Sequence, residues 1–209
     1  MQRIPLQHPA QKCSGFAHYF GRFLIKVFGW RVEGGVPENK HMLIIAAPHT
    51  SNWDALFLLG AAYSFGIKVN WLVKNSFFVP VLAQMITYFG GVPVDRSRAT
   101  NMVSRLADQI RNSDGTNLVV PPAGTRSYTE YWKSGFYRIA LEANIPVVCG
   151  YLDYDRKVAG LGLTFELSGE VKADMARIRE FYEPLVGKYP DQKSRVLLKE
   201  EEETPSKRA

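Results

Sequence analysis

From His41 onward, short apolar runs alternate with segments of helical periodicity, and this alternation constrains the fold more than any other feature of the chain. Strands are expected where an apolar run is bounded by Gly, Pro, Asn or Asp. The expected strands are Met42–Ala47, Val69–Val73, Val92–Val94, Asn117–Val120, Pro146–Leu152 and Leu163–Ser168. The expected helices are Asp54–Ser64, Val79–Phe89, Asn101–Asn112, Gly135–Ala143 and Ala173–Val186. This order predicts an α/β domain, with helices covering a largely parallel mixed sheet.

Residues 15–30 predict an N-terminal amphipathic helix. Its apolar stripe has three-and-four spacing and comprises Phe16, Tyr19, Phe20, Phe23, Leu24, Val27 and Phe28. The first acidic residue of the chain is Glu33, and five basic residues precede it. Such a stripe, flanked only by positive charge, is typical of a helix lying on anionic lipid. It is equally expected of a helix that packs on the domain core, and both interpretations stay open, since they can hold together.

The 209 residues suffice for one sizeable core, so we expect a single folded domain with a segment before it and a tail after it. These are a basic membrane-interface segment (1–31), one folded domain (32–198) and a charged flexible tail (199–209). The apolar stretch Asn75–Val94 contains two prolines and two adjacent glycines, which predicts a helix followed by a strand rather than a membrane span.

The net charge of +6 and the pI near 9.3 favour anionic partners such as lipid, phosphorylated substrate or nucleic acid. Because no nucleic-acid motif is recognised, we expect no nucleic-acid partner. Cys13 and Cys149 have no metal-ligand spacing, so neither a metal site nor a disulfide framework is predicted, and a reducing, cytoplasmic compartment is expected.

His49 and Asp54 are the strongest candidates for catalysis. His49 follows an apolar strand, and Asp54 falls in the first turn of the next helix, at the kind of junction where α/β proteins place their sites. The carboxylate can therefore turn back to accept from one imidazole nitrogen, which leaves the other to deprotonate an alcohol. A helix-capping aspartate beside an unrelated loop histidine would give the same spacing.

A phosphate pocket is expected from two further segments, each of which ends a predicted strand with an arginine. One carries Arg96, and the other is the turn of Gly124, Thr125, Arg126 and Ser127. Two guanidinium groups, two backbone amides and two hydroxyls would suit a phosphate. Either arginine alone could instead form a surface ion pair.

With these residues in place, the chain resembles the glycerolipid acyltransferase family, whose bacterial prototype is 1-acylglycerol-3-phosphate acyltransferase. The similarity runs from Ile44 to Tyr154 and is nearest to a short bacterial branch. His49 and Asp54 match the family's His-x-x-x-x-Asp pair. Lys74, followed by Pro80 and GGVPVDRS, matches the second block, AGTRS (123–127) the third and IPVV (145–148) the fourth.

The resemblance implies transfer of a fatty acyl group from acyl-CoA or acyl carrier protein to the hydroxyl of a lysophospholipid, commonly 1-acylglycerol-3-phosphate. His49 and Asp54 would be catalytic, Arg96 and Arg126 would hold the phosphate, and Lys74 is placed in the same site. The resemblance implies no metal and no organic cofactor. We expect peripheral association with the cytoplasmic face of the cell membrane.

Two positions depart from the family pattern. Pro48 stands where an asparagine usually precedes the histidine, and Ala123 stands where the third block usually has a glutamate. We expect the missing carboxylate to leave a roomier, less negative acceptor pocket, and hence an active enzyme with an altered acceptor. The alternative is a catalytically silent relative that binds lysophospholipid or acyl-CoA.

Overall fold

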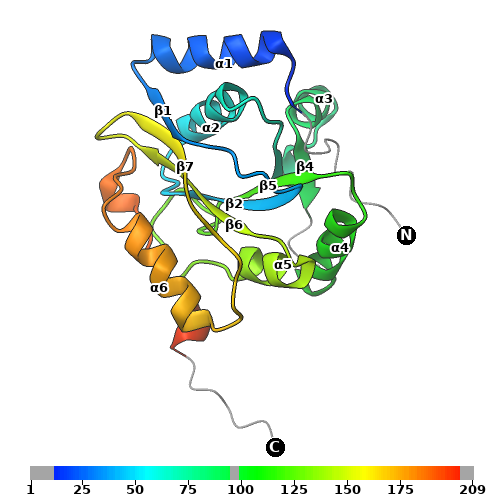
Figure 1. Ribbon diagram of the computed structural model, residues 1–209, viewed down its shortest axis with the longest axis vertical. Coiled ribbons are helices and arrows are strands. Elements are labelled where there is room, and N and C mark those ends of the chain that lie inside the picture. The colour runs from blue at the N-terminus through cyan, green and yellow to red at the C-terminus, as the bar shows by residue number, and fades with distance from the viewer. Residues whose placement is uncertain (1–11, 95–98, 203–209) are drawn as a thin grey trace, which may run out of the picture.

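The computed structural model describes residues 12–94 and 99–202, which form a seven-stranded sheet with helices on both faces (Figure 1). The strands are β1 (Arg31–Gly34), β2 (His41–Ala47), β3 (Asn70–Lys74), β4 (Gly91–Val94), β5 (Thr116–Val120), β6 (Val147–Asp153) and β7 (Val158–Phe165). The helices are α1 (Gly15–Val27), α2 (Trp53–Ser64), α3 (Pro80–Tyr88), α4 (Ala99–Arg111), α5 (Gly135–Ala143) and α6 (Val171–Tyr182). Short 3₁₀ turns are η1 (Asn75–Phe77), η3 (Pro190–Gln192) and η4 (Lys199–Glu201).

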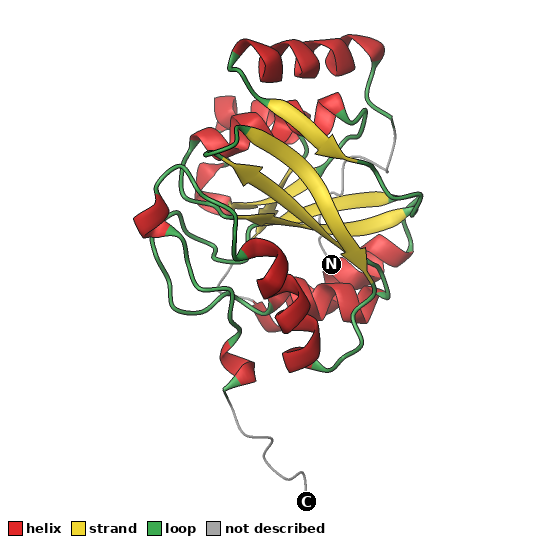
Figure 2. Cartoon of the chain, turned by 60° about the vertical axis from the view of Figure 1, so that its left-hand side comes forward, coloured by secondary structure: helices red, strands yellow, loops and turns green. Residues whose placement is uncertain are grey.

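The strand order is β1-β7-β6-β2-β5-β3-β4, and of the paired strands in the described chain only β6 and β7 run antiparallel. The prediction of a largely parallel mixed sheet is therefore confirmed. Strands β2, β5, β3 and β4 all end at one edge, and residues of the loops after β2 and β5 lie together there. Figure 2 shows the sheet between its helical layers.

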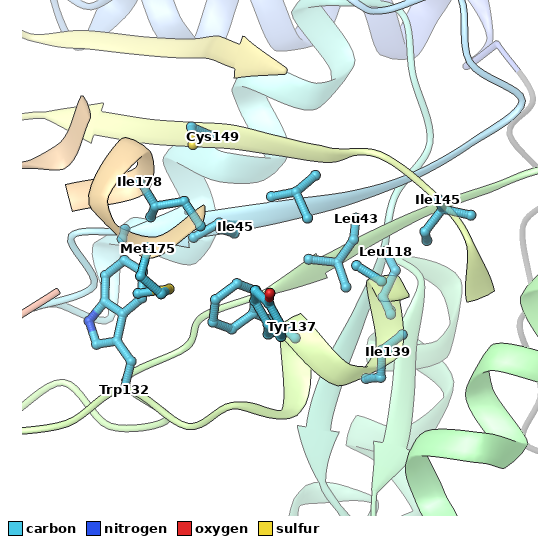
Figure 3. Close-up of a cluster of buried hydrophobic side chains, with 14 of the residues drawn as sticks. Leu43, Ile45, Leu118, Trp132, Tyr137, Ile139, Ile145, Cys149, Met175 and Ile178 are labelled. Atoms are coloured by element: carbon cyan, nitrogen blue, oxygen red, sulfur yellow. The ribbon is translucent and has the colours of Figure 1, made fainter. Parts of the chain in front are cut away.

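The central strand β2 is apolar from Met42 to Ala47, as expected of a strand with both faces covered. Leu43 and Ile45 belong to the core on one side, and Met42 and Ile44 to the core on the other. Figure 3 shows the first of these cores, where Leu43 and Leu118 of the sheet lie near Tyr137 and Ile139 of α5, and Ile45 lies near Met175 and Ile178 of α6.

Helix α1 forms an outer layer that packs mainly on α2 (Figure 1). It also contacts β1, and its Ile25 belongs to a core cluster with Leu152 of β6 and Ala159 of β7. Contact is close at Gly21, where an added Cβ would lie 2.8 Å from the carbonyl oxygen of Gly60. The predicted stripe faces mainly the other way, because Phe16, Tyr19 and Phe23 are 82%, 74% and 65% exposed. The interpretation that this stripe packs on the core is thus wrong for these residues, and Gly21 and Ile25 make up the buried face. No described helix is long and apolar enough to cross a bilayer.

Two strands correct the sequence prediction. Strand β1 was not expected, and β7 starts at Val158, five residues before the predicted Leu163. In the sequence, the glycines of β7 indicate a loop rather than a strand. In the structure, an added Cβ at Gly160 would lie 2.5 Å from the ring of Tyr151, and one at Gly162 would lie 2.3 Å from the ring of Phe181. These glycines make room for aromatic rings against the strand.

The start of the predicted tail also differs from expectation. Lys199–Glu201 form the 3₁₀ turn η4, in which Glu201 is buried and pairs with Arg179 of α6. The side chain of Glu201 also accepts from the backbone amide of Leu198 at 2.7 Å. These contacts hold the first glutamates against the domain, and residues 203–209 lie outside the described chain.

Candidate functional site

The loop between β2 and α2 brings His49 and Asp54 together as predicted. Nδ1 of His49 lies 3.0 Å from Oδ2 of Asp54, and the same oxygen accepts from the backbone amides of Thr50 and Ser51 at 2.9 Å each. Helix α2 starts here, and the hydroxyl of Ser51 accepts from the amide of Trp53 at 3.2 Å. Asp54 therefore holds the loop and the imidazole at once, and Nε2 is left as the nitrogen that can accept a proton.

Asp54 is almost fully buried, whereas the side chain of His49 is 20% exposed. Burial by itself would raise the pKa of Asp54. Hydrogen bonds from His49, from the hydroxyl of Tyr154 and from the Ser51 amide outweigh burial and hold this pKa below its ordinary value. The carboxylate is thus ionised at neutral pH and acts as the acceptor, which fixes the proton of the neutral imidazole on Nδ1.

A cavity of about 360 Å³ opens beside the pair, between α2 and the sheet. His49 and Asp54 lie at the sheet edge where β2 ends. The wall is otherwise mainly apolar, with Leu58, Leu59, Ala62 and Phe65 from α2 and its end, and Ile44, Val69, Trp71, Val119 and Leu161 from the sheet. A pocket of this size with few polar groups at one end is suited to a ligand with an apolar body and a reactive head.

The turn after β5 supplies part of the predicted phosphate pocket. Gly124, Thr125 and Arg126 line the cavity near His49, but Ser127 is exposed, and it is not among the described residues around this cavity. Gly124 has φ +65°, and an added Cβ there would lie 2.9 Å from Nζ of Lys133. Lys133 is thus a second basic group beside this turn.

The structure does not describe the side chains of two predicted substrate-binding residues, Arg96 and Lys74. Arg96 falls within 95–98 and is outside the described residues. For Lys74 the structure describes the backbone, which ends β3 at the same sheet edge as His49 and pairs with Val94.

Ala123 does not have the position that we expected. It is buried, belongs to the core that includes Trp132, and lines a small cavity of about 10 Å³ rather than the large one. Ala123 is therefore not part of the large cavity's wall, and the expectation that it makes the acceptor pocket roomier stays a prediction. Pro48, by contrast, lines the large cavity beside His49 and follows a cis peptide bond.

The segment after α6 also reaches the site, and sequence patterns did not predict it. The hydroxyl of Thr50 accepts from the amide of Tyr189 at 3.2 Å. The side-chain amide of Gln192 is oriented with its nitrogen toward two backbone carbonyls. This nitrogen donates to the carbonyl of Thr50 at 3.1 Å and to that of Arg126 at 2.7 Å. Gln192 thus ties together the two loops that carry His49 and Arg126.

Comparison with known proteins identifies the family of this chain. A family model described as Acyltransferase matches residues 30–152, which is more than half of the chain. The chain belongs to the Acyltransferase family. The matched segment of this acyltransferase includes His49, Asp54 and the turn of Arg126, and it ends before the segment that carries Gln192. A comparison with curated proteins finds no significant match.

A solved structure supports the fold. The acyltransferase is similar to the crystal structure of the 1-acyl-sn-glycerophosphate (LPA) acyltransferase PlsC from Thermotoga maritima, with a TM-score of 0.58 and 18% sequence identity. The match covers 80% of this chain and 76% of that chain. At this identity the likeness establishes a shared α/β fold.

Proposed function

We propose that this acyltransferase transfers a fatty acyl group from acyl-CoA or acyl carrier protein to the hydroxyl of a lysophospholipid, with 1-acylglycerol-3-phosphate as the first candidate. The observation that carries the proposal is the His49–Asp54 hydrogen bond at the mouth of a mainly apolar cavity, with Arg126 on the same wall. This arrangement combines a base, an anion-binding side chain and room for an acyl chain.

In this proposal Nε2 of His49 takes the proton of the acceptor hydroxyl as its oxygen attacks the carbonyl carbon of the thioester. The tetrahedral intermediate then collapses, the carbon–sulfur bond breaks, and the proton passes from His49 to the leaving thiolate. Asp54 stabilises the imidazolium formed between these steps and fixes the ring. The reaction as proposed needs no metal and no organic cofactor.

The proposed acceptor site is the turn after β5. The Arg126 side chain would bind the acceptor's phosphate, with the amides of Gly124 and Thr125 and the amino group of Lys133 beside it. Arg96 and Lys74 stay predictions for the same phosphate. The acyl chain would occupy the cavity under α2.

We further propose that α1 holds the enzyme peripherally on the cytoplasmic face of the cell membrane. The exposed Phe16, Tyr19 and Phe23 would enter the lipid interface, and Arg22 and Lys26 on the same helix would face anionic head groups. A lysophospholipid acceptor would then be drawn from the surface to which the enzyme binds.

The test is to offer the purified protein a panel of lysolipids with acyl-CoA or acyl carrier protein, and to identify products by mass spectrometry. We expect an acylated lysophospholipid from the wild type, and a loss of about 10²- to 10⁴-fold for His49→Ala at an unchanged melting temperature. Activity of His49→Ala within a few-fold of the wild type would contradict the assignment of the base. Saturable lysolipid binding without turnover in the wild type would instead favour a silent relative.

A further inference from the structure

The two oxygens of Asp54 have different partners. Oδ2 accepts from His49 and from the two loop amides, all within five residues in sequence. Oδ1 accepts from the hydroxyl of Tyr154 at 2.6 Å, and Tyr154 lies 100 residues further along the chain, in the turn between β6 and β7. The hydrogen bond from Tyr154 therefore holds Oδ1, the carboxylate oxygen that the loop between β2 and α2 does not contact.

Tyr154 is held from two directions. Its ring packs edge-on against Trp30, with centroids 4.8 Å apart, and against Phe57 of α2 at 6.0 Å. Its backbone amide donates to the carbonyl of Val186 at 2.9 Å. The turn that follows is tied to Asp153, whose carboxylate accepts from the amide of Asp155 at 3.2 Å. The hydroxyl of Tyr154 is thus pre-organised toward Asp54 before any substrate binds.

We propose that Tyr154 is a positioning residue of the acyl-transfer site, which acts through Asp54 to keep the imidazole of His49 oriented. The proposal rests on the function proposed above. Three donors hold Oδ2, and the hydrogen bond from Tyr154 to Oδ1 adds a contact on the other oxygen, which further restrains rotation of the carboxylate about its Cβ–Cγ bond. An imidazole held by a fixed carboxylate presents Nε2 to the acceptor hydroxyl in one direction.

The hydroxyl also affects the charge balance of the pair. Its hydrogen bond is one of the interactions that lower the pKa of Asp54, and burial together with this bond raises the pKa of Tyr154, so Tyr154 stays protonated and donates. Other charged groups near the pair come from separate elements: Arg126 after β5, and Lys193 after α6 in the small cavity beside His49. Without the Tyr154 hydroxyl, one of the hydrogen bonds that lower the pKa of Asp54 would be lost, so the carboxylate would take up a proton at a higher pH.

Tyr154→Phe tests the proposal because it keeps the ring that packs on Trp30 and Phe57. We expect kcat to fall about 10-fold or more, with the acceptor KM nearly unchanged and the acid limb of the kcat/KM profile moved to higher pH. The matched control is Tyr137→Phe, which removes a similar buried hydroxyl–carboxylate bond, 2.7 Å to Asp174, away from the site. This control should lose stability but keep the pH profile and kcat.

A double-mutant cycle shows whether Tyr154 acts through Asp54. Tyr154→Phe should add little to the loss already caused by Asp54→Asn, since the charged acceptor is then gone. Full additivity, or a Tyr154→Phe enzyme with wild-type kcat and pH profile, would overturn the proposal.

A readout without substrate separates this proposal from the proposed function. The Nδ1 proton of His49 that Asp54 accepts should give a downfield proton NMR signal, assigned by its loss in His49→Ala. We expect Tyr154→Phe to shift or broaden this signal, and Tyr137→Phe to leave it in place. An unmoved signal in Tyr154→Phe would overturn the positioning role, even if no lysolipid proved to be an acceptor. A shifted signal in a protein without acyl transfer would support the positioning role and contradict the proposed function alone.

Discussion

Arg126 is the cationic side chain of the site whose role can be tested most directly. Arg126 lines the cavity near His49, and its backbone carbonyl accepts from the side chain of Gln192. Because hydrogen bonds to a charged group contribute about 1.5–3 kcal/mol each, Arg126→Ala should raise the acceptor KM about 10- to 100-fold while the donor KM changes little. Initial rates with each substrate varied in turn measure this difference.

Arg195→Ala is the control for Arg126→Ala. Arg195 is exposed and contacts Glu130 at 3.6 Å, so the change removes a similar charge from the surface outside the cavity. It should leave both KM values unchanged. An equal loss for an acceptor that lacks a phosphate would show that Arg126 does not recognise that group.

Asp54 also predicts a pH dependence of stability. Its pKa is lowered in the folded protein, so its interactions stabilise the fold above its unfolded-state pKa of about 3.9 and are lost as pH falls through the folded value. The free-energy difference of unfolding between the wild type and Asp54→Asn should therefore shrink between pH 5 and about pH 3. Urea unfolding of both proteins over this range measures it, and a constant difference would contradict the assignment.

At the residue scale, local spacing was enough to predict the His49–Asp54 contact, because five residues separate the two and a strand-to-helix turn brings them together. No local spacing in the sequence indicated that Tyr154 or Gln192 belongs to the site. Both reach the site from segments far away in sequence, and their roles depend on the tertiary arrangement of β6, β7 and the chain after α6.

At the scale of elements, the contact between α1 and α2 depends on glycine at position 21. An added Cβ there would lie 2.6 Å from Cβ of Tyr63, whereas nothing lies within 4 Å of one at Gly15 in the same helix. Gly21→Ala should therefore destabilise the protein by about 1–3 kcal/mol through overpacking, despite the better helix propensity of alanine. Gly15→Ala, the matched control, should not lower the melting temperature. Equal melting temperatures for both variants would show that α1 is not held closely at Gly21.

The exposed face of α1 is the basis for the prediction that the protein binds to membranes. Replacing Phe16, Tyr19 and Phe23 together with serine should weaken binding to anionic vesicles at least about 10-fold, since each large apolar side chain can contribute about 1.5–3 kcal/mol when fully buried. Salt should weaken wild-type binding only in part, because it screens the charges and spares the apolar contact. Co-sedimentation with vesicles measures both effects.

Leu141→Ser on α5 is the control for vesicle binding, since Leu141 is 40% exposed on the opposite side of the sheet. It should bind vesicles as the wild type does. Unchanged vesicle binding of the triple variant in a folded protein would leave α1 with only its packing role against α2.

The errors in the predicted elements have physical causes. Strand β1 is only four residues long and contains Glu33, so it shows no apolar run, and its parallel pairing with β7 is what makes it a strand. In β7, glycines that read as turn residues are needed because aromatic rings lie against the strand. The buried strand β2 was predicted to within one residue, because covering both faces makes it continuously apolar.

At the scale of the whole molecule, the cavity follows helix α2 from its first turn to the residue after its last turn, with sheet residues on the other side. Helix α2 starts at Trp53, near the edge where β2 ends, and runs back toward the opposite edge, where Ile67 and Val69 lead into β3. The α/β topology predicted from the sequence places the reactive pair at one end of this path. The volume and lining of the cavity could not be predicted, because they depend on how α2 packs over β2, β5 and β7.

Two alanines of α2 mark the ends of this path and give the last prediction. Ala62→Leu fills the end far from His49, so it should select shorter acyl chains, with a loss of about 10-fold or more for each methylene that no longer fits. Ala55→Leu, the same change at the mouth, should lower turnover for all chain lengths alike. Acyl donors of increasing length, assayed with both variants and with melting temperatures to check folding, give the two profiles. A profile for Ala62→Leu that matches the wild type would mean that the acyl chain does not reach α2's far end, and the cavity would then have to hold another part of the substrates.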